Sequence, residues 1–404
     1  MSLIPAELSS FELPTPTEEH RQLRDMLVEF VRDEVEPQAE EHNQTETFNW
    51  PLFRRMGELG LFGVTVPEEA GGTGMDSTAA CLVCEELSFA DAGLGLAWLA
   101  HTLLFVNNLY FNGNEDQRSR YLPRAISGEW LAGMCMTEPA AGTDVPGGLA
   151  CKAVRQGDVY LLNGEKTLIT NGSRDEQTPG DVFIVYALTG TGLSSFIVES
   201  RFAGFSVGQR FHGKLGMRSS ATASLVFEDC RVPVENILGA EGESPQHMMR
   251  NLEIERLGLA AQSLGMARRS LRAMTTYAMQ RRAFGQPINR FGQVQFHIAE
   301  SYAEYRAARA YVYDVARQLV LGEMGHRLDC DGAKLFAAHM AKRVADRAIQ
   351  VLGGYGYFGE YVVERMWRDA KLIEIGGGTV EAHQKNITKD LTKALERDPQ
   401  GRFL

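Results

Sequence analysis

The sequence predicts an α+β fold built from three consecutive units: a helical unit over residues 1–130, a β unit over residues 131–240 and a helical unit over residues 241–404. Two changes of pattern predict this order. Apolar residues recur at intervals of three and four before Trp130 and after Pro245, whereas short apolar runs alternate with turn residues in between. A chain of 404 residues also exceeds one ordinary core, so we expect several packed units in one compact body.

The first unit is predicted to be all-helical from Glu18 onward. Leu23, Leu27 and Phe30 follow one another at helical spacing, with Met26 and Val31 beside them. This spacing places their side chains on one face of a helix, where they can bury against neighbouring helices.

The middle unit carries strand-and-turn chemistry. The segments VYLLNGEKTLITNG, DVFIVYALTGTG, SSFIVES and ASLVFEDCRVP are rich in β-branched and aromatic residues and are bounded by Asn-Gly and Gly-Thr-Gly turns. Such residues favour a pleated, half-buried surface. We expect a β-barrel or β-sandwich.

The third unit contains the longest helical patterns, ERLGLAAQSLGMARRSLRAMTTYAMQRR and FHIAESYAEYRAARAYVYDVARQLVL. Long helices with apolar stripes usually pack against each other. We predict a four-helix bundle, with ligand sites where the three units meet.

The composition limits the kinds of binding partner that we expect. The chain has 41 basic and 52 acidic residues, a net charge of −11, and no long basic stretch, so nucleic acid and anionic membranes are poor candidates. The first 20 residues carry acids and prolines instead of a secretion signal, and we find no apolar run of the roughly 18 residues that a membrane span needs. We expect a cytoplasmic protein without a membrane partner.

Two motif-like strings have simpler interpretations. Cys81 and Cys84 form a C-x-x-C, which suits redox chemistry or half a zinc site, but no second pair exists, so buried thiols and no metal site are expected. The string from Gly354 to Gly359 matches G-x-G-x-x-G but follows a helical pattern instead of a strand, which favours a helix C-terminus over a dinucleotide fingerprint. Hydrolase and NTPase motifs of the common types are missing from the sequence.

Five segments carry a family resemblance. They are MCMTEPAAGTDV (134–145), NGEKTLITNG (163–172), KLGMRSSATASLVFEDCRVP (214–233), YAMQRRAFGQPI (277–288), and QVLGGYGY followed by RDAKLIEIGGGTVEA (350–382). In order and spacing they resemble the acyl-CoA dehydrogenase family. The resemblance implies FAD as cofactor, an acyl-CoA substrate, an electron-transfer flavoprotein as acceptor, and a homotetramer that shares FAD between subunits.

The first two segments, by resemblance, lie along the flavin ring. Met134, Met136 and Thr137 belong to the family's T-E-P loop at the flavin edge, and Thr143 takes the place of a serine that touches the CoA chain and adjoins the cofactor. Leu168 stands where the family has a tryptophan packed on the flavin, which loses aromatic stacking. The next two residues, Ile169 and Thr170, keep the rest of this motif.

The later segments resemble the part of the family that binds the adenylate half of FAD across a subunit boundary. Arg281 matches an arginine that reaches the FAD pyrophosphate, which suits a bidentate cation. The remaining positions carried over to FAD are Phe284, Gln350, Gly353, Gly354, Thr379 and Glu381. A family glutamine falls on Gly292, so Gln293 or Gln295 is left to replace it. The third segment, 214–233, reads as strand scaffold.

The catalytic base is not where most of the family has it. Most members carry a glutamate just before a Gly-Thr pair, and here that position is Gly377. A minority, including isovaleryl-CoA dehydrogenase and long-chain members, takes the base from a string similar to L-E-R-L on another helix. At 100° per residue, Glu255 shares a side with Leu252 and Leu259, and with Met248 and Met266, whereas Glu253 points away.

Glu255 is therefore the predicted base. An apolar surround disfavours its charge and raises its pKa toward the range of a general base. The alternative is a glutamate paired with an arginine inside the bundle. Arg256 resembles an arginine near the CoA moiety, with a structural ion pair as its alternative, and Gly376 and Gly377 leave space for a branched or wide acyl group.

These residues predict FAD-dependent α,β-dehydrogenation of a short or branched acyl-CoA thioester. Two other functions remain open on the same scaffold. An acyl-CoA oxidase or flavin monooxygenase would consume dioxygen, and a catalytically silent thioester-binding protein would explain the departures at Leu168 and Gly292.

Overall fold

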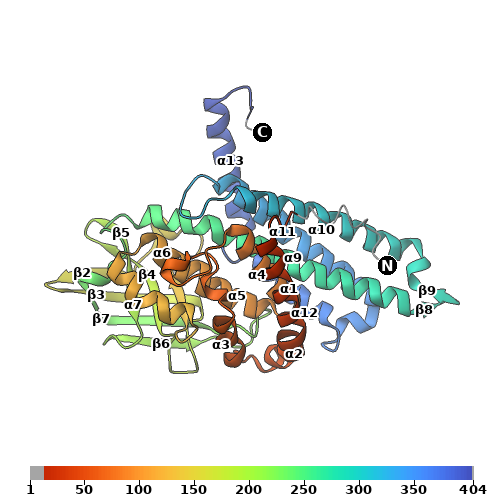
Figure 1. The fold of residues 1–404 in the computed structure, drawn as a ribbon, viewed down its shortest axis with the longest axis horizontal. Coiled ribbons are helices and arrows are strands. Elements are labelled where there is room, and N and C mark those ends of the chain that lie inside the picture. Colours follow the sequence, from red (N-terminus) through yellow and green to blue (C-terminus); the bar gives the residue numbers. More distant parts are fainter. Residues whose placement is uncertain (1–12, 403–404) are drawn as a thin grey trace.

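The computed structural model describes residues 13–402, which form N-terminal helices, a middle sheet and C-terminal helices (Figure 1). The N-terminal helices are α1 (Glu18–Phe30), α2 (Glu36–Thr45), α3 (Trp50–Glu58), α4 (Ser77–Ala90), α5 (Ala92–His101), α6 (Asn107–Asn112) and α7 (Glu115–Ile126). Several begin at a side-chain cap: Asp91 Oδ1, for example, accepts from the backbone N–H groups of Gly93 and Leu94.

Helices α5 and α6 form one rod over Ala92–Asn112, joined by a π-helical turn at Thr102–Val106. This rod is long and apolar enough to cross a membrane, so the expectation that no such segment exists was wrong. Isolated polar residues such as His101 interrupt the run and hide it from a simple count. Because 83% of its apolar window is buried inside the protein, the rod is a core helix.

The middle strands form one seven-stranded sheet in the order β1-β4-β2-β3-β7-β6, with β5 paired to β4. The strands are β1 (Ala132–Cys135), β2 (Lys152–Gln156), β3 (Val159–Thr170), β4 (Val182–Thr189), β5 (Gly192–Glu199), β6 (Phe205–Arg210) and β7 (Thr222–Pro233), and a short helix α8 (Val145–Gly148) follows β1. Register shifts interrupt the β3–β7 pairing, and one of them falls between Lys166 and Ile169. Leu168 lies inside this bulge, which turns its side chain outward.

The C-terminal bundle is built on α9 (Ser244–Gln280), the longest helix of the described residues. It runs from the sheet to the hairpin of β8 (Arg282–Ala283) and β9 (Gln286–Pro287) at the other end of the molecule (Figure 1). The helices packed around it are α10 (Gly292–Gln318), α11 (Arg327–Leu352) and α12 (Val362–Ile373). Helix α13 (Val380–Arg397) projects from the body. The predicted α, β, α architecture is confirmed.

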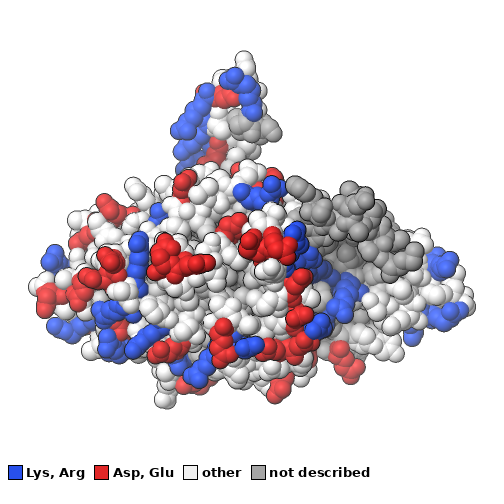
Figure 2. Space-filling model, viewed as in Figure 1, with Lys and Arg blue, Asp and Glu red and all other residues white. Residues whose placement is uncertain are grey.

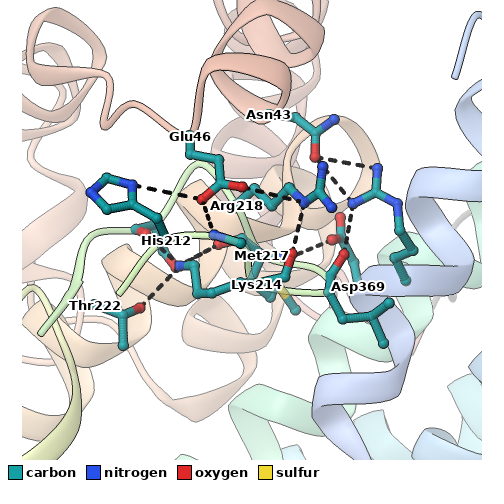
Figure 3. A network of polar contacts seen from close by, with 12 residues as sticks. Asn43, Glu46, His212, Lys214, Met217, Arg218, Thr222 and Asp369 are labelled. Atoms are coloured by element: carbon teal, nitrogen blue, oxygen red, sulfur yellow. Dashed lines mark hydrogen bonds and ion pairs between the residues drawn. The ribbon is translucent and has the colours of Figure 1, made fainter. Parts of the chain in front are cut away.

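A polar network around Lys214 joins the three units (Figure 3). Lys214 Nζ donates to Met217 O at 2.8 Å and to Ser220 O at 2.6 Å, and the N–H of Met217 donates to Asp369 of α12 at 2.6 Å. Arg218 lies 3.8 Å from Glu46, which follows α2. Burial lowers the pKa of Lys214 to about 8. This segment holds the loop before β7 against both helical units.

The two motif-like strings have structural roles. All six cysteines are free and buried, as expected for core thiols. The glycine string from Gly354 follows the end of α11 and lies largely in a 3₁₀ turn, with Gly353 at positive φ as the C-cap, as predicted for a helix terminus. On the face that Figure 2 shows, acidic and basic side chains are interspersed.

Candidate active site

Glu255 lies near the middle unit, on the apolar stripe of α9. Glu255 is only 8% exposed, and its Oε2 atom has no hydrogen-bond partner within residues 13–402. Burial raises the pKa of Glu255 to about 7, against the opposing charges of Arg256 and Lys334. A carboxyl group that titrates near neutrality is suited to accept a proton.

Glu253, two residues earlier, has a different environment. Its Oε2 accepts from the N–H of His326 at 3.0 Å and its Oε1 from the N–H of Gly325 at 3.3 Å. The carboxylate thus caps the beginning of α11, where free backbone N–H groups attract negative charge. Glu253 therefore has a hydrogen-bond donor at each carboxylate oxygen, whereas Glu255 Oε2 has none among the described residues.

Gly377 meets Glu255 in space although the two are far apart in sequence. A Cβ atom built on Gly377 would lie 3.7 Å from Glu255 Oε1 and 2.1 Å from Leu259 Cδ1. Gly377 also has a φ of +63°, a conformation that disfavours other residues. The carboxylate from α9 therefore borders the position from which a residue-377 side chain would begin, and Leu259 fills part of that position.

A buried charged cluster surrounds this contact, and sequence reasoning missed it. Arg256 Nε lies 3.1 Å from Asp331 Oδ1, which is also 2.6 Å from His383 Nδ1. Lys334, fully buried on α11, donates to Gly376 O at 2.9 Å and to Gly378 O at 2.6 Å. The ion pair proposed as the alternative for Arg256 is present.

A signal for Lys334 existed in the sequence. It stands four residues after Cys330 and three before Ala337, on the buried face of α11. A lysine at helical spacing within an apolar stripe needs acceptors in the core.

The loop after β1 lies against β3 and brings the predicted flavin-edge residues together. The N–H of Thr167 donates to Thr137 O at 2.9 Å. Lys166, also fully buried, donates to Met136 O at 3.2 Å and to Glu138 Oε1 at 2.7 Å. Sequence reasoning missed this buried ion pair, which fixes the loop next to the bulge of β3.

Side chains at this edge differ in exposure. Met134, Met136 and Thr170 are half-buried and Ile169 is buried, whereas Thr143 is exposed. Leu168 is 63% exposed and has a φ of +57°, which is unusual for leucine. An exposed apolar side chain held at positive φ is suited to meet a ligand or partner.

An open pocket lies at the other end of the bundle. Arg281, Gly353 and Gly354 line it, so three predicted FAD residues from two distant segments come together. The guanidinium of Arg281 lies 5.8 Å from the centre of the Tyr355 ring. No described atom comes within 4 Å of a Cβ built on either glycine, which leaves their backbone accessible.

Other predicted residues at this end are exposed. Phe284, in the turn between β8 and β9, is 96% exposed, and Gln350 is exposed in the last turn of α11. Gly292, Gln293 and Gln295 are exposed at the beginning of α10.

The predicted site residues form two groups that do not meet within one chain. The helix rises by 25 residue steps from Glu255 to Gln280, which corresponds to about 38 Å. Thr379, whose hydroxyl caps α13, and the exposed Glu381 belong to the end with Glu255, close to the glycine turn. Arg281 and the pocket belong to the other end.

The chain is similar to known proteins over most of its length. Models of the N-terminal, middle and C-terminal domains of acyl-CoA dehydrogenases match residues 17–129, 133–230 and 246–392. Isovaleryl-CoA dehydrogenase from Arabidopsis thaliana is 42% identical over 379 residues, which cover 92% of this chain and 91% of that protein.

Two solved structures are also similar. Butyryl-CoA dehydrogenase from Megasphaera elsdenii has a TM-score of 0.89 at 34% identity, covering 93% of this chain and 98% of that one. A glutaryl-CoA dehydrogenase from Mycobacterium smegmatis in complex with FADH2 has a TM-score of 0.89 at 28% identity, covering 96% and 97%. By its three domains and its relatives, this chain belongs to the acyl-CoA dehydrogenase family of oxidoreductases.

Proposed function

We propose that this enzyme catalyses FAD-dependent α,β-dehydrogenation of a short or branched acyl-CoA thioester, with Glu255 as the catalytic base and an electron-transfer flavoprotein as acceptor. One observation carries the proposal. The family's usual base position is Gly377, and the carboxylate of Glu255 lies against that same position from another helix.

The environment of Glu255 suits removal of the α-proton. Its pKa of about 7 leaves much of the carboxylate ionised at neutral pH, yet gives it enough basicity to take a proton from carbon activated by a thioester. Its Oε2 atom has no competing donor among the described residues. When bound, FAD supplies the acceptor for the hydride that leaves the β-carbon.

The residues present fit FAD. The loop at Thr137 and the bulge at Leu168 offer backbone groups and an exposed apolar side chain for a flat ring. The pocket at Arg281 offers a cation and open glycine backbone for an anionic, nucleotide-like group. Since about 38 Å of α9 separates the two ends, one FAD needs them from different subunits. We therefore propose a homotetramer that shares FAD.

The acyl-chain preference follows from the glycine turn at Gly376 and Gly377 and from one side chain of α9, Gln262. Gly376 and Gly377 lack side chains beside Glu255, and although Leu259 fills part of the position at 377, the smaller turn favours a branched acyl group. Gln262 lies two turns, or about 10 Å, beyond Glu255 on the same face. It is fully buried, packs against Gly95, and neither amide atom has a hydrogen-bond partner within residues 13–402. A polar side chain there limits the depth available to a longer chain.

Anaerobic titration of the purified protein with straight, branched and cyclic acyl-CoA esters tests the proposal. We expect short branched esters to bleach the flavin fastest. Absence of bleaching by every ester would contradict dehydrogenation, and equal rates for straight and branched esters of one length would contradict the branch preference. Rapid dioxygen consumption in an oxygen electrode would indicate an oxidase or monooxygenase, and purified protein without flavin absorbance would indicate a silent binding protein.

A further inference from the structure

Lys334 is a buried cation beside the proposed base. Its side chain comes from α11, is fully buried, and donates to Gly376 O at 2.9 Å and to Gly378 O at 2.6 Å. These carbonyls flank Gly377, whose Cβ position lies 3.7 Å from Glu255 Oε1. One ammonium group therefore holds both sides of the turn that borders the carboxylate.

The charges around Lys334 leave Glu255 as its main counter-charge. Arg256 is paired with Asp331, whereas no carboxylate in residues 13–402 lies within 4.0 Å of Lys334 Nζ. Burial lowers the pKa of Lys334 to about 8, and the charge that opposes this most is Glu255. The titratable and charged groups on the elements packed around the pair are Arg256 on α9, Asp331 on α11, Glu374 after α12, His383 on α13 and Tyr186 on β4.

The turn has a second support in His383 of α13. His383 Nε2 lies 3.0 Å from Gly378 O and its Nδ1 lies 2.6 Å from Asp331 Oδ1, so both ring nitrogens face oxygen acceptors, and burial lowers the pKa of His383. Gly378 O thus accepts from both the lysine and the histidine. The support of the turn is shared, and Lys334 is, after Arg256, the second cation that lowers the pKa of Glu255.

We propose that Lys334 is a positioning residue for the base: it fixes the turn from Gly376 to Gly378 against Glu255 and keeps a positive charge beside the carboxylate. The inference rests on the proposed role of Glu255 in proton removal. Its consequence is electrostatic. Without the cation, the carboxylate loses stabilisation and takes up its proton at higher pH.

The test is the pH dependence of anaerobic flavin reduction in Lys334→Met, Lys334→Gln and Lys334→Arg. The rate of flavin reduction should fall at low pH as Glu255 becomes protonated, and we call this part of the pH profile the acid limb. Loss of one nearby charge should raise the midpoint of the acid limb by about one pH unit in the Met and Gln variants. Lys334→Arg, which keeps the charge, should restore most of the wild-type midpoint. The Lys334→Gln variant keeps a donor for the two carbonyls but lacks the charge. If its midpoint equals that of Lys334→Met, the shift is due to the lost charge.

Lys214→Met is the matched control, because Lys214 is also buried, has a pKa lowered to about 8, and belongs to the scaffold network of Figure 3. We expect it to lower the melting temperature and leave the acid-limb midpoint unchanged. An unmoved midpoint in folded, yellow Lys334→Met would overturn the proposal, as would an equal shift in Lys214→Met.

A measurement without substrate covers variants that do not turn over. Infrared titration of the carboxylic-acid band that disappears in Glu255→Gln gives the protonation midpoint directly. An upward shift of this midpoint in Lys334→Gln supports the inference, and an identical midpoint contradicts it. If wild-type flavin is not bleached by any acyl-CoA ester, the proposed function fails. The infrared titration still tests whether Lys334 changes the protonation midpoint of Glu255.

Discussion

The molecule buries two glutamates in opposite ways. Glu85 of α4 lies at the junction of α4, α9 and α10, where Tyr313 Oη donates to it at 2.6 Å and Arg309 Nε at 3.2 Å. Arg268 lies 3.4 Å away. Burial pushes the pKa of Glu85 up, but Arg309, Arg268, Tyr313 and Arg24 together outweigh burial and the pKa is lowered. Glu255 lacks such direct partners, and its pKa rises to about 7.

The difference shows that burial alone does not create a base. A buried carboxylate with cations and hydroxyl donors in contact is fixed in its charged form and serves the fold. Glu255 lacks such partners, which lowers the stability of the fold but leaves a carboxylate that can accept a proton. The two sites lie on the same bundle, so each is a control for the other.

Glu255→Gln should have the largest effect, because it removes the proton acceptor while preserving shape. We expect the rate of anaerobic flavin bleaching to fall by about 10²–10⁴-fold, with the yellow cofactor still bound. Glu253→Gln on the same helix is the matched control and should retain bleaching. Bleaching by Glu255→Gln at the wild-type rate would refute the assignment.

Glu85→Gln should instead weaken the fold. It leaves the buried Arg309 without its counter-charge, whereas Arg268 keeps its ion pair with Glu86. Removing one partner of a buried ion pair costs about 3–5 kcal/mol. Chemical denaturation measures this loss. If Glu85→Gln still supports flavin reduction, its acid-limb midpoint should equal that of the wild type. A shift in that midpoint would mean that the two sites are coupled.

The pH dependence of stability should have a sign set by Glu255. Its pKa is about 7 in the folded protein against a model value of 4.5, so stabilisation is complete below pH 4.5 and is lost as the pH rises through 7. The loss amounts to about 3 kcal/mol. Glu255→Gln removes this term, so its melting temperature relative to wild type should rise between about pH 5 and 8. A difference independent of pH would mean that Glu255 is ionised throughout.

Gln262→Ala should have a smaller effect, which is limited to the preference of the enzyme for the length of the acyl chain. Removing this side chain deepens the space beyond Glu255, so the ratio of kcat/KM for longer over shorter acyl-CoA esters should rise about 10-fold or more. Gln262→Glu, of similar volume, is the control for depth. An unchanged ratio in the alanine variant would show that the acyl chain does not reach this position.

The sequence predicted the parts of this structure that depend on local pattern. Helical spacing separated Glu255 from Glu253, and strand chemistry located the middle sheet, because both follow from periods of 3.6 and 2 residues. The partners of Lys334 required tertiary structure. Its acceptors lie 42 and 44 residues away, in a glycine turn whose place against α11 no local pattern encodes.

The same limit explains the two groups of predicted FAD residues. Sequence similarity named Thr137, Leu168, Arg281 and Gly353 as parts of one site, but only the straight course of α9 reveals how far the two ends lie apart.

The length of α9 has a genetic consequence. Under the proposed sharing of FAD, a chain that lacks the carboxylate at 255 and another that lacks the guanidinium at 281 are each inactive when alone. Coexpressed, they can assemble a mixed oligomer in which some sites receive one intact end from each parent. Rescue between two defective alleles is thus the expected behaviour of a cofactor site divided between opposite ends of one helix.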